Sequence, residues 1–138
     1  MQKSFVKEFK LYCKKKNLDV NSHQIKLIKT LEEYYKLNYK SFISKILSKK
    51  NYKKGFYLYG DVGVGKTMIL DFFFNLVEGK KLKLHFNEFM LSFHDFVHQS
   101  KNKNDENKLS KFVKKLKSKA KLIYFDEFQV TNIVDAMI

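Results

Sequence analysis

The chain has 138 residues, a formal net charge of +14 and a single cysteine. This length corresponds to about one domain with a buried core, and a hydrophobic content of 44% excludes a wholly disordered chain. One cysteine excludes a disulfide framework and a cysteine metal cluster, and no apolar run reaches the roughly 18 residues of a membrane span.

All the basic residues are lysines, because the sequence contains no arginine. Residues 1–54 hold 15 Lys and 4 acidic residues, whereas residues 55–138 hold 13 Lys and 10 acidic residues. Lys, Phe and Asn are abundant, as expected for an AT-rich genome, so we interpret the charge first as solvated surface. The alternative is contact with nucleic acid or an anionic membrane, and with Lys alone such contact would be non-specific.

The N-terminus has neither the apolar segment of a secretory signal nor the arginines of a mitochondrial transit peptide. We therefore expect a cytoplasmic location, with peripheral attachment to the inner membrane as a variant of it.

Residues 1–54 are predicted to form a basic helical N-terminal region. The segment SHQIKLIKTLEEYYKL begins with Ser22 as the expected cap and has an apolar face made of Ile25, Ile28, Leu31 and Tyr35. The segment YKSFISKILSKK continues the helical pattern with Phe42, Ile43, Ile46 and Leu47. The polar cluster KKNYKK indicates a loop and a boundary near residue 54.

Residues 55–138 alternate between strand and helix patterns. Strands are predicted at GFYLY, KLKLHF and KLIYF, which are residues 55–59, 81–86 and 121–125. Helices are predicted at TMILDFFFNLV, NEFMLSFHDFVHQS and LSKFVKKLK, which are residues 67–77, 87–100 and 109–117. Strand and helix repeated in this way predict an α/β fold with a parallel sheet.

Residues 60–67 read GDVGVGKT and match the phosphate-binding pattern G-x-x-x-x-G-K-[ST]. The glycines let the backbone adopt unusual conformations and approach a ligand closely. Backbone N–H groups and the dipole of the following helix would hold the β-phosphate, Lys66 would reach the β- and γ-phosphates of ATP, and Thr67 would ligate Mg²⁺. The predicted nucleotide-binding residues are Gly60, Asp61, Val62, Gly63, Val64, Gly65, Lys66, Thr67 and Met68.

A carboxylate at the end of another parallel strand is expected if this loop binds nucleotide with Mg²⁺. In KLIYFDEF, Asp126 follows the apolar strand and would hold the hydration shell of the metal. Glu127 would polarise the attacking water, so Glu127 and Lys66 are the predicted catalytic residues. The alternatives are a surface turn without ligand at the glycine loop and a solvated acidic turn at the two carboxylates.

Three segments, GFYLYGDVGVGKTMILDFFF, HFNEFM and YFDEFQVTNIVDAMI, resemble in order and spacing the ZapE-like AAA+ ATPases. This family, also described as Afg-type, includes a bacterial cell-division ATPase and its mitochondrial lactation-elevated relative. The likeness covers residues 55–138, and generic phosphate-loop proteins lack the phrases FQVT and DAM. The resemblance implies ATP and Mg²⁺ as ligands and assigns the metal and catalytic acids to Asp126 and Glu127. The chain departs from the family pattern at three places. The family usually has Arg near the position of Lys83, His at the position of Asn87 and Asp at the position of Asn132.

The resemblance also implies a five-stranded sheet of order 5-1-4-3-2, of which this sequence supplies the first three strands. We therefore expect an incomplete AAA+ domain in residues 55–138, within an N-terminal fragment of a longer enzyme. The sensor of the fourth strand lies outside the sequence, and a chain without arginine supplies no arginine finger. For the complete protein, the resemblance implies ATP hydrolysis that moves a protein substrate, a division or membrane protein, with a homo-oligomer as the assembly.

Two other functions stay open at this point. A helicase-loader-type ATPase acting on DNA would use the basic N-terminal helices. A truncated product would bind nucleotide without turnover, or bind nothing.

Other residues were weighed as sites. His94 and His98 flank an acid on one helical face, a near match to a zinc motif, but we interpret them as a solvated or core-edge face. Glu88, near His85, suits the dipole of the helix that begins there, with a role at the rim of the nucleotide site or in substrate contact as the alternative. Lysines near Cys13 would lower its pKa, although without a base partner we interpret this thiol as incidental.

Overall fold

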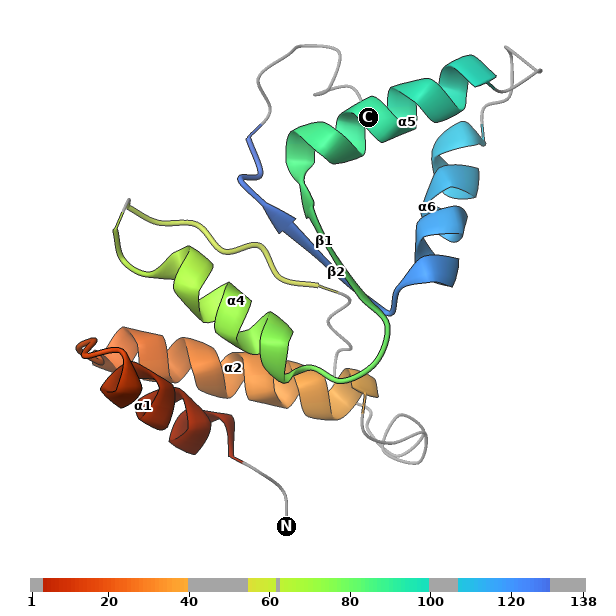
Figure 1. The fold of residues 1–138 in the computed structure, drawn as a ribbon. Helices are drawn as coiled ribbons and strands as arrows, with labels where there is room; N and C mark the ends of the chain where they lie inside the picture. The colour runs from red at the N-terminus through yellow and green to blue at the C-terminus, as the bar shows by residue number, and fades with distance from the viewer. Residues whose placement is uncertain (1–3, 40–54, 62, 100–106, 130–138) are drawn as a thin grey trace. The chain divides into compact units, whose positions relative to one another are not determined.

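The computed structural model describes residues 4–39, 55–61, 63–99 and 107–129. These residues form five helices and two strands. The chain divides into two compact units, Met1–Val77 and Glu78–Ile138, and we describe each unit by itself (Figure 1).

The described residues of the first unit form three helices, α1 (Phe5–Lys15), α2 (Ser22–Tyr39) and α4 (Lys66–Leu76). Aromatic side chains join them: the ring of Phe9 meets that of Phe72 edge-on at 5.1 Å, and Phe5 lies 5.3 Å from Tyr35 between ring centroids. The predicted apolar face of α2 is confirmed, because Ile28, Leu31 and Tyr35 are buried. The predicted helix after the glycine loop is confirmed as well, with buried Ile69, Phe72 and Phe73.

The first turn of α1 is held by a carboxylate that belongs to α2. The Phe5 N–H donates to Glu32 Oε2 at 3.2 Å, while Ser4, the N-cap residue, makes no side-chain cap bond. The other oxygen of Glu32 accepts from Lys36 Nζ at 2.8 Å. Glu32 is only 9% exposed, so this buried charge is compensated by a backbone donor, a lysine and the positive end of a helix dipole.

The prediction that Ser22 caps α2 is wrong by one residue. Ser22 is already in the helix, and Asn21 precedes it. Asn21 Oδ1 accepts from the Gln24 N–H at 2.9 Å, and Gln24 Oε1 accepts from the Asn21 N–H at 3.2 Å. This reciprocal pair is a capping box, which requires a Glu or Gln three residues after the cap; that spacing selects Asn21.

The expected strand over GFYLY is not formed in the structure. Residues 55–60 carry no strand assignment, and Tyr57 and Tyr59 are 67% and 81% exposed. A strand is stabilised by ladder bonds to a neighbour, and the sheet of the described residues pairs only β1 with β2. Within its unit, the ring of Phe56 lies 5.0 Å from that of Tyr34 between centroids. The helical pattern predicted for residues 39–50 and the boundary near residue 54 fall almost wholly on residues 40–54, outside the described part of the chain, and stay predictions.

The second unit confirms the other two predicted strands and both predicted helices. Strand β1 (Lys81–His85) leads into α5 (Phe86–Gln99), and α6 (Lys108–Lys119) leads into β2 (Leu122–Asp126). The strands pair in parallel, with Lys81 opposite Leu122 and His85 opposite Asp126. This agrees with the expected order, in which the second and third strands are neighbours. The chain therefore has a partial α/β fold.

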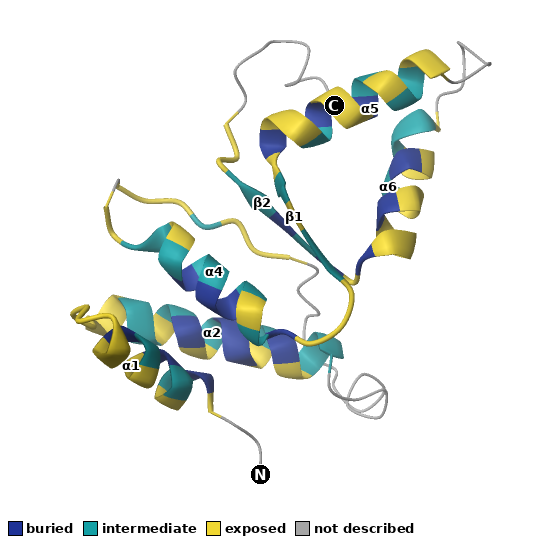
Figure 2. Ribbon diagram, viewed as in Figure 1, coloured by how far each residue is buried: buried dark blue, intermediate teal, exposed yellow. Residues whose placement is uncertain are grey.

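The helices of the second unit cover one face of its strand pair. Both α5 and α6 carry buried segments, which are dark blue in Figure 2. Phe93, Phe112 and Leu116 form the buried centre, and the half-buried side chains packed on it are Leu82, Phe89, Phe96, Val97, Leu109 and Ile123. Leu82 and Ile123 are register partners, so they share this face. Successive side chains of a strand point to opposite faces of the sheet. The other face of the strand pair therefore carries Lys83 and His85 of β1 and Tyr124 and Asp126 of β2.

Candidate functional site

The glycine loop has the backbone that its sequence pattern predicts. Gly60, Gly63 and Gly65 have φ values of 147°, 84° and 85°, a region that other residues rarely adopt. Gly65 is the N-cap of α4, and the Ile69 N–H donates to its carbonyl oxygen at 3.0 Å. A Cβ added at Gly60 or Gly63 would meet no atom within 4 Å, so conformation rather than crowding requires glycine there. Val62 lies outside the described residues.

Lys66 is the first residue of α4 and closes the loop on itself. Its Nζ donates to the carbonyl oxygens of Gly60 at 2.8 Å and Asp61 at 2.5 Å. An ammonium has three donors, so one stays available to a phosphate oxygen. Thr67 is exposed in the first turn of the helix, where its hydroxyl can reach a ligand, and Met68 is half-buried behind it.

Gln24, a residue of α2, contacts the glycine loop, and the sequence did not predict this contact. Its Nε2 donates to the carbonyl oxygen of Val64 at 3.5 Å, a long contact, while its Oε1 completes the cap of α2. The same Nε2 lies 3.2 Å from the place where a Cβ of Gly65 would be. The spacing of Asn21 and Gln24 signals the cap, but nothing in the sequence signals the contact across 40 residues.

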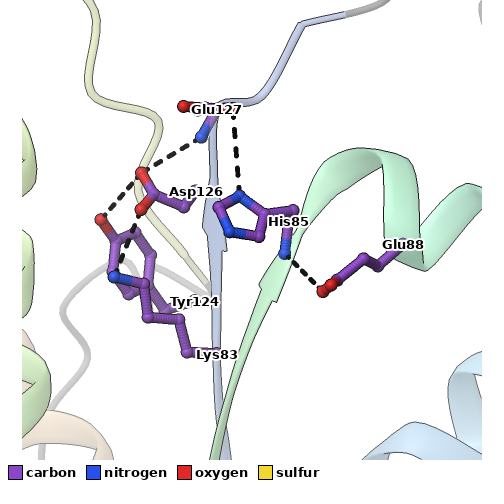
Figure 3. Close-up of polar contacts among 6 residues, drawn as sticks. All are labelled: Lys83, His85, Glu88, Tyr124, Asp126 and Glu127. Carbon is purple, nitrogen blue, oxygen red and sulfur yellow. Dashed lines mark hydrogen bonds and ion pairs between the residues drawn. The ribbon is translucent and has the colours of Figure 1, made fainter.

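Asp126 ends β2, and both of its oxygens have partners (Figure 3). Oδ1 accepts from the Tyr124 hydroxyl at 3.3 Å and from the Glu127 N–H at 3.2 Å. Oδ2 pairs with Lys83 Nζ at 3.2 Å, and this ammonium lies 4.9 Å from the centroid of the Tyr124 ring. The structure thus places the carboxylate of Asp126, on β2, next to the ammonium of Lys83, on the neighbouring strand β1.

Glu127 follows at a sharp turn of the backbone. Its φ of 50° is uncommon for a residue with a side chain, and its carboxylate is 79% exposed, with Oε2 at 4.0 Å from His85 Nδ1. An exposed acid at a strand end can meet a water molecule near a bound phosphate. The His85 N–H donates to Glu88 Oε2 at 3.2 Å, so Glu88 caps the start of α5. Its place in the first turn agrees with the expected interaction with the helix dipole.

The remaining predictions concern His94, His98 and Cys13. Within the described ranges, no group of three or more His, Cys, Asp or Glu could hold a metal ion. The expectation for Cys13 is wrong in direction: its side chain is fully buried against the helices of the first unit, and this burial raises the pKa of the thiol. Desolvation disfavours the thiolate and is the cause of the raised pKa.

The donor chemistry fits Mg²⁺, whose ligands are oxygens of carboxylates and hydroxyls. Thr67 and Asp126 offer such oxygens, and the Lys83 ammonium at 3.2 Å shows that Asp126 already holds a cation. The glycine loop belongs to the first unit and Asp126 and Glu127 to the second, so the two sets of residues are described separately.

Helices on a parallel strand pair, with a glycine loop at the start of a helix, define a protein of the α/β class. The model of the AFG1-like ATPase family matches residues 10–138. The chain therefore belongs to the AFG1-like ATPase family.

Curated relatives agree with this assignment. The chain is 40% identical over 101 residues to Lactation elevated protein 1 homolog B of Danio rerio, covering 66% of this chain and 20% of the relative. It is 36% identical over 86 residues to Cell division protein ZapE of Escherichia coli K12, covering 62% and 22%. The chain thus spans about a fifth of the length of these relatives. No solved structure matches it. Among the described residues, no helix is both long and apolar enough to cross a membrane.

Proposed function

We propose that this chain binds ATP with Mg²⁺ and forms the nucleotide-binding part of an ATPase. The observation that carries the proposal is the glycine loop, with Gly63 and Gly65 at positive φ and Lys66 at the first position of α4. In a loop of this kind, backbone N–H groups and the positive end of the following helix would hold a phosphate. The membership in an ATPase family supports the same conclusion.

Each site residue has a role in this proposal. Lys66 contributes a point charge to the β- and γ-phosphates, and the loop N–H groups of residues 63–68 orient them. Thr67 and Asp126 hold Mg²⁺, which when bound neutralises charge on the phosphates. Glu127 accepts a proton from the water that attacks the γ-phosphate in line. Its exposed carboxylate and its position at the end of β2 suit that task.

ATP binding is tested with Lys66→Ala and a fluorescent ATP analogue. A hydrogen bond to a charged group is worth about 1.5–3 kcal/mol, so the dissociation constant should rise by about 10- to 100-fold. Lys29→Ala is the matched control, since it removes one exposed lysine from a helix of the same unit. The proposal fails if Lys66→Ala binds as tightly as the wild type, or if the control loses as much affinity.

Hydrolysis is proposed for the complete protein and is tested separately with Glu127→Gln. This change keeps the size of the side chain and removes the base, so Mg²⁺-dependent phosphate release should fall by at least about 100-fold. ATP should remain bound, because the glutamate does not hold the phosphates. Turnover that is absent in the unaltered protein as well would favour the alternative of a product without activity.

The partners of the complete protein are part of the same proposal. We infer a protein substrate, a division protein or a membrane protein, a homo-oligomeric assembly, and a cytoplasmic location with peripheral attachment to the inner membrane as a variant. The name of the E. coli relative refers to cell division. A nucleotide-trapped Glu127→Gln protein should retain such a substrate in co-purification, and the wild type should retain it less.

A second candidate function is action on DNA. Five lysines on and next to α1 are exposed, namely Lys7, Lys10, Lys14, Lys15 and Lys16. Binding through such lysines would release counterions, so affinity for duplex DNA should fall steeply with salt. An affinity that is immeasurable at low salt would eliminate this candidate.

A further inference from the structure

The carboxylate of Asp126 is fully engaged by groups of its own unit. The Tyr124 hydroxyl and the Glu127 N–H point at Oδ1, and the Lys83 ammonium pairs with Oδ2 (Figure 3). Lys83 reaches Asp126 because the register places it opposite Tyr124, two residues before Asp126 on the same face. The Tyr124 ring, 4.9 Å from the ammonium, supports that position through a cation–π contact.

We propose that Lys83 is a positioning residue that occupies Asp126 until a divalent cation replaces it. This inference rests on the proposed function, since it concerns the carboxylate that we assign to Mg²⁺. The ammonium neutralises Asp126 while no metal is bound and holds the side chain in one orientation. A metal ion that binds through Oδ2 must displace the ammonium, so Lys83 raises the metal concentration at which the site fills.

The size of the effect follows from the exposure of the pair. The Lys83 side chain is 35% exposed and that of Asp126 is 14% exposed. Fully exposed pairs alter such equilibria by less than about fivefold, and buried pairs by much more. We therefore expect Lys83→Met to lower the metal concentration at half-saturation by about three- to tenfold.

The test uses Mn²⁺ as the probe and the ¹⁵N-labelled chain without nucleotide. Mn²⁺ at Asp126 broadens the amide signal of Glu127, whose N–H donates to Oδ1 of that carboxylate. Lys83→Met should bring this broadening to a three- to tenfold lower Mn²⁺ concentration. Lys83→Gln is a second neutral variant, and the dispersion of each spectrum reports whether that variant is folded.

Two matched variants separate the ion pair from general charge and from structure. Lys81→Met removes the same charge from the same strand, opposite Leu122, and should leave the Mn²⁺ titration unchanged. Lys83→Arg keeps a positive charge next to Asp126 and should restore the wild-type titration. The inference is overturned if the neutral Lys83 variants titrate like the wild type, if Lys81→Met shifts equally, or if Mn²⁺ broadens Glu127 in no variant.

The same variants distinguish this inference from the proposed function. A wild-type chain that fails to bind the fluorescent ATP analogue would refute nucleotide binding, while a lowered Mn²⁺ requirement in Lys83→Met would still support the ion-pair exchange. Where the analogue binds, Lys83→Met should lower the Mg²⁺ concentration that gives half the Mg²⁺-dependent gain in affinity. Its affinity in EDTA should stay at the wild-type value. An equal gain in EDTA would contradict the exchange.

Discussion

Gly65→Ala tests whether the contact between Gln24 of α2 and the carbonyl oxygen of Val64 stabilises the glycine loop. Gly65 has φ 85° and ψ 21°, and its added Cβ would lie 3.2 Å from Gln24 Nε2 and 3.3 Å from Met68 Cε. Gly63 has almost the same φ, 84°, but its added Cβ meets nothing within 4 Å. The two substitutions therefore share a backbone cost and differ in the contact with Gln24.

The magnitudes can be separated in the same way. An alanine in the left-handed region costs about 1–2 kcal/mol, and we expect this cost for Gly63→Ala and for Gly65→Ala. The Cβ at Gly65 also pushes the amide of Gln24 away, which breaks its 3.5 Å bond to Val64. A neutral hydrogen bond contributes about 0.5–1.5 kcal/mol, and this long, exposed one belongs at the lower end. Gly65→Ala should therefore destabilise by about 0.5–1 kcal/mol more than Gly63→Ala.

The assay is urea unfolding followed by circular dichroism, repeated in a Gln24→Ala background. Loss of the cap of α2 in that background affects both glycine variants equally and cancels in their difference. With the Gln24 amide removed, the gap between Gly65→Ala and Gly63→Ala should close to the residual contact with Met68. A stabilising role of Gln24 is refuted if the two glycine variants are equally destabilised in the wild-type background, or if their difference is unchanged without Gln24.

Three further predictions concern the first unit. Glu32→Ala should lower the free energy of unfolding in urea by about 1.5–3 kcal/mol, because it leaves the first amide of α1 without its hydrogen-bond acceptor. Glu33→Ala, at an exposed position, should lower it by less than about 0.5 kcal/mol. Asn21→Ala should cost about 1 kcal/mol and Ser22→Ala nearly nothing, and equal losses would contradict the assigned cap. Burial raises the pKa of Cys13. At pH 8.5 the thiol of an unfolded chain is about half ionised, so the folded chain should react with iodoacetamide far more slowly than the chain in urea. Equal rates would refute the burial of this thiol.

Helices and paired strands were predictable because their signal is local. The apolar residues of α2 and α6 recur at helical spacing, and in the structure Ile28, Leu31, Phe112 and Leu116 are buried as that spacing requires. The glycines of the loop were predictable for a related reason, since the motif encodes a backbone conformation. The side-chain roles assigned from the motif to Lys66, Thr67, Asp126 and Glu127 stay predictions until a ligand is bound.

The errors arose where structure depends on a partner distant in sequence. GFYLY has the composition of a buried strand, but a strand forms only beside another, and Tyr59 is 81% exposed. Glu32 is one of two adjacent acids on a helix, and nothing in the sequence signals its bond to the amide of Phe5, 27 residues away. The same applies to Gln24 and Lys83, whose importance comes from contacts across 40 residues and across two strands.

The charged groups at both sets of site residues are already satisfied without a ligand. Lys66 donates to the carbonyls of its own loop, and Asp126 accepts from Lys83, Tyr124 and Glu127. Metal binding at Asp126 is therefore an exchange of partners, and its free energy is the difference between two bonded states rather than the full strength of the new contact. Lys66, in contrast, can add a phosphate oxygen through its third donor. Charged groups that already have partners avoid the free-energy cost of burying an unpaired carboxylate or ammonium. They also make affinity sensitive to residues that never touch the ligand, and Lys83 is the residue through which that sensitivity can be measured.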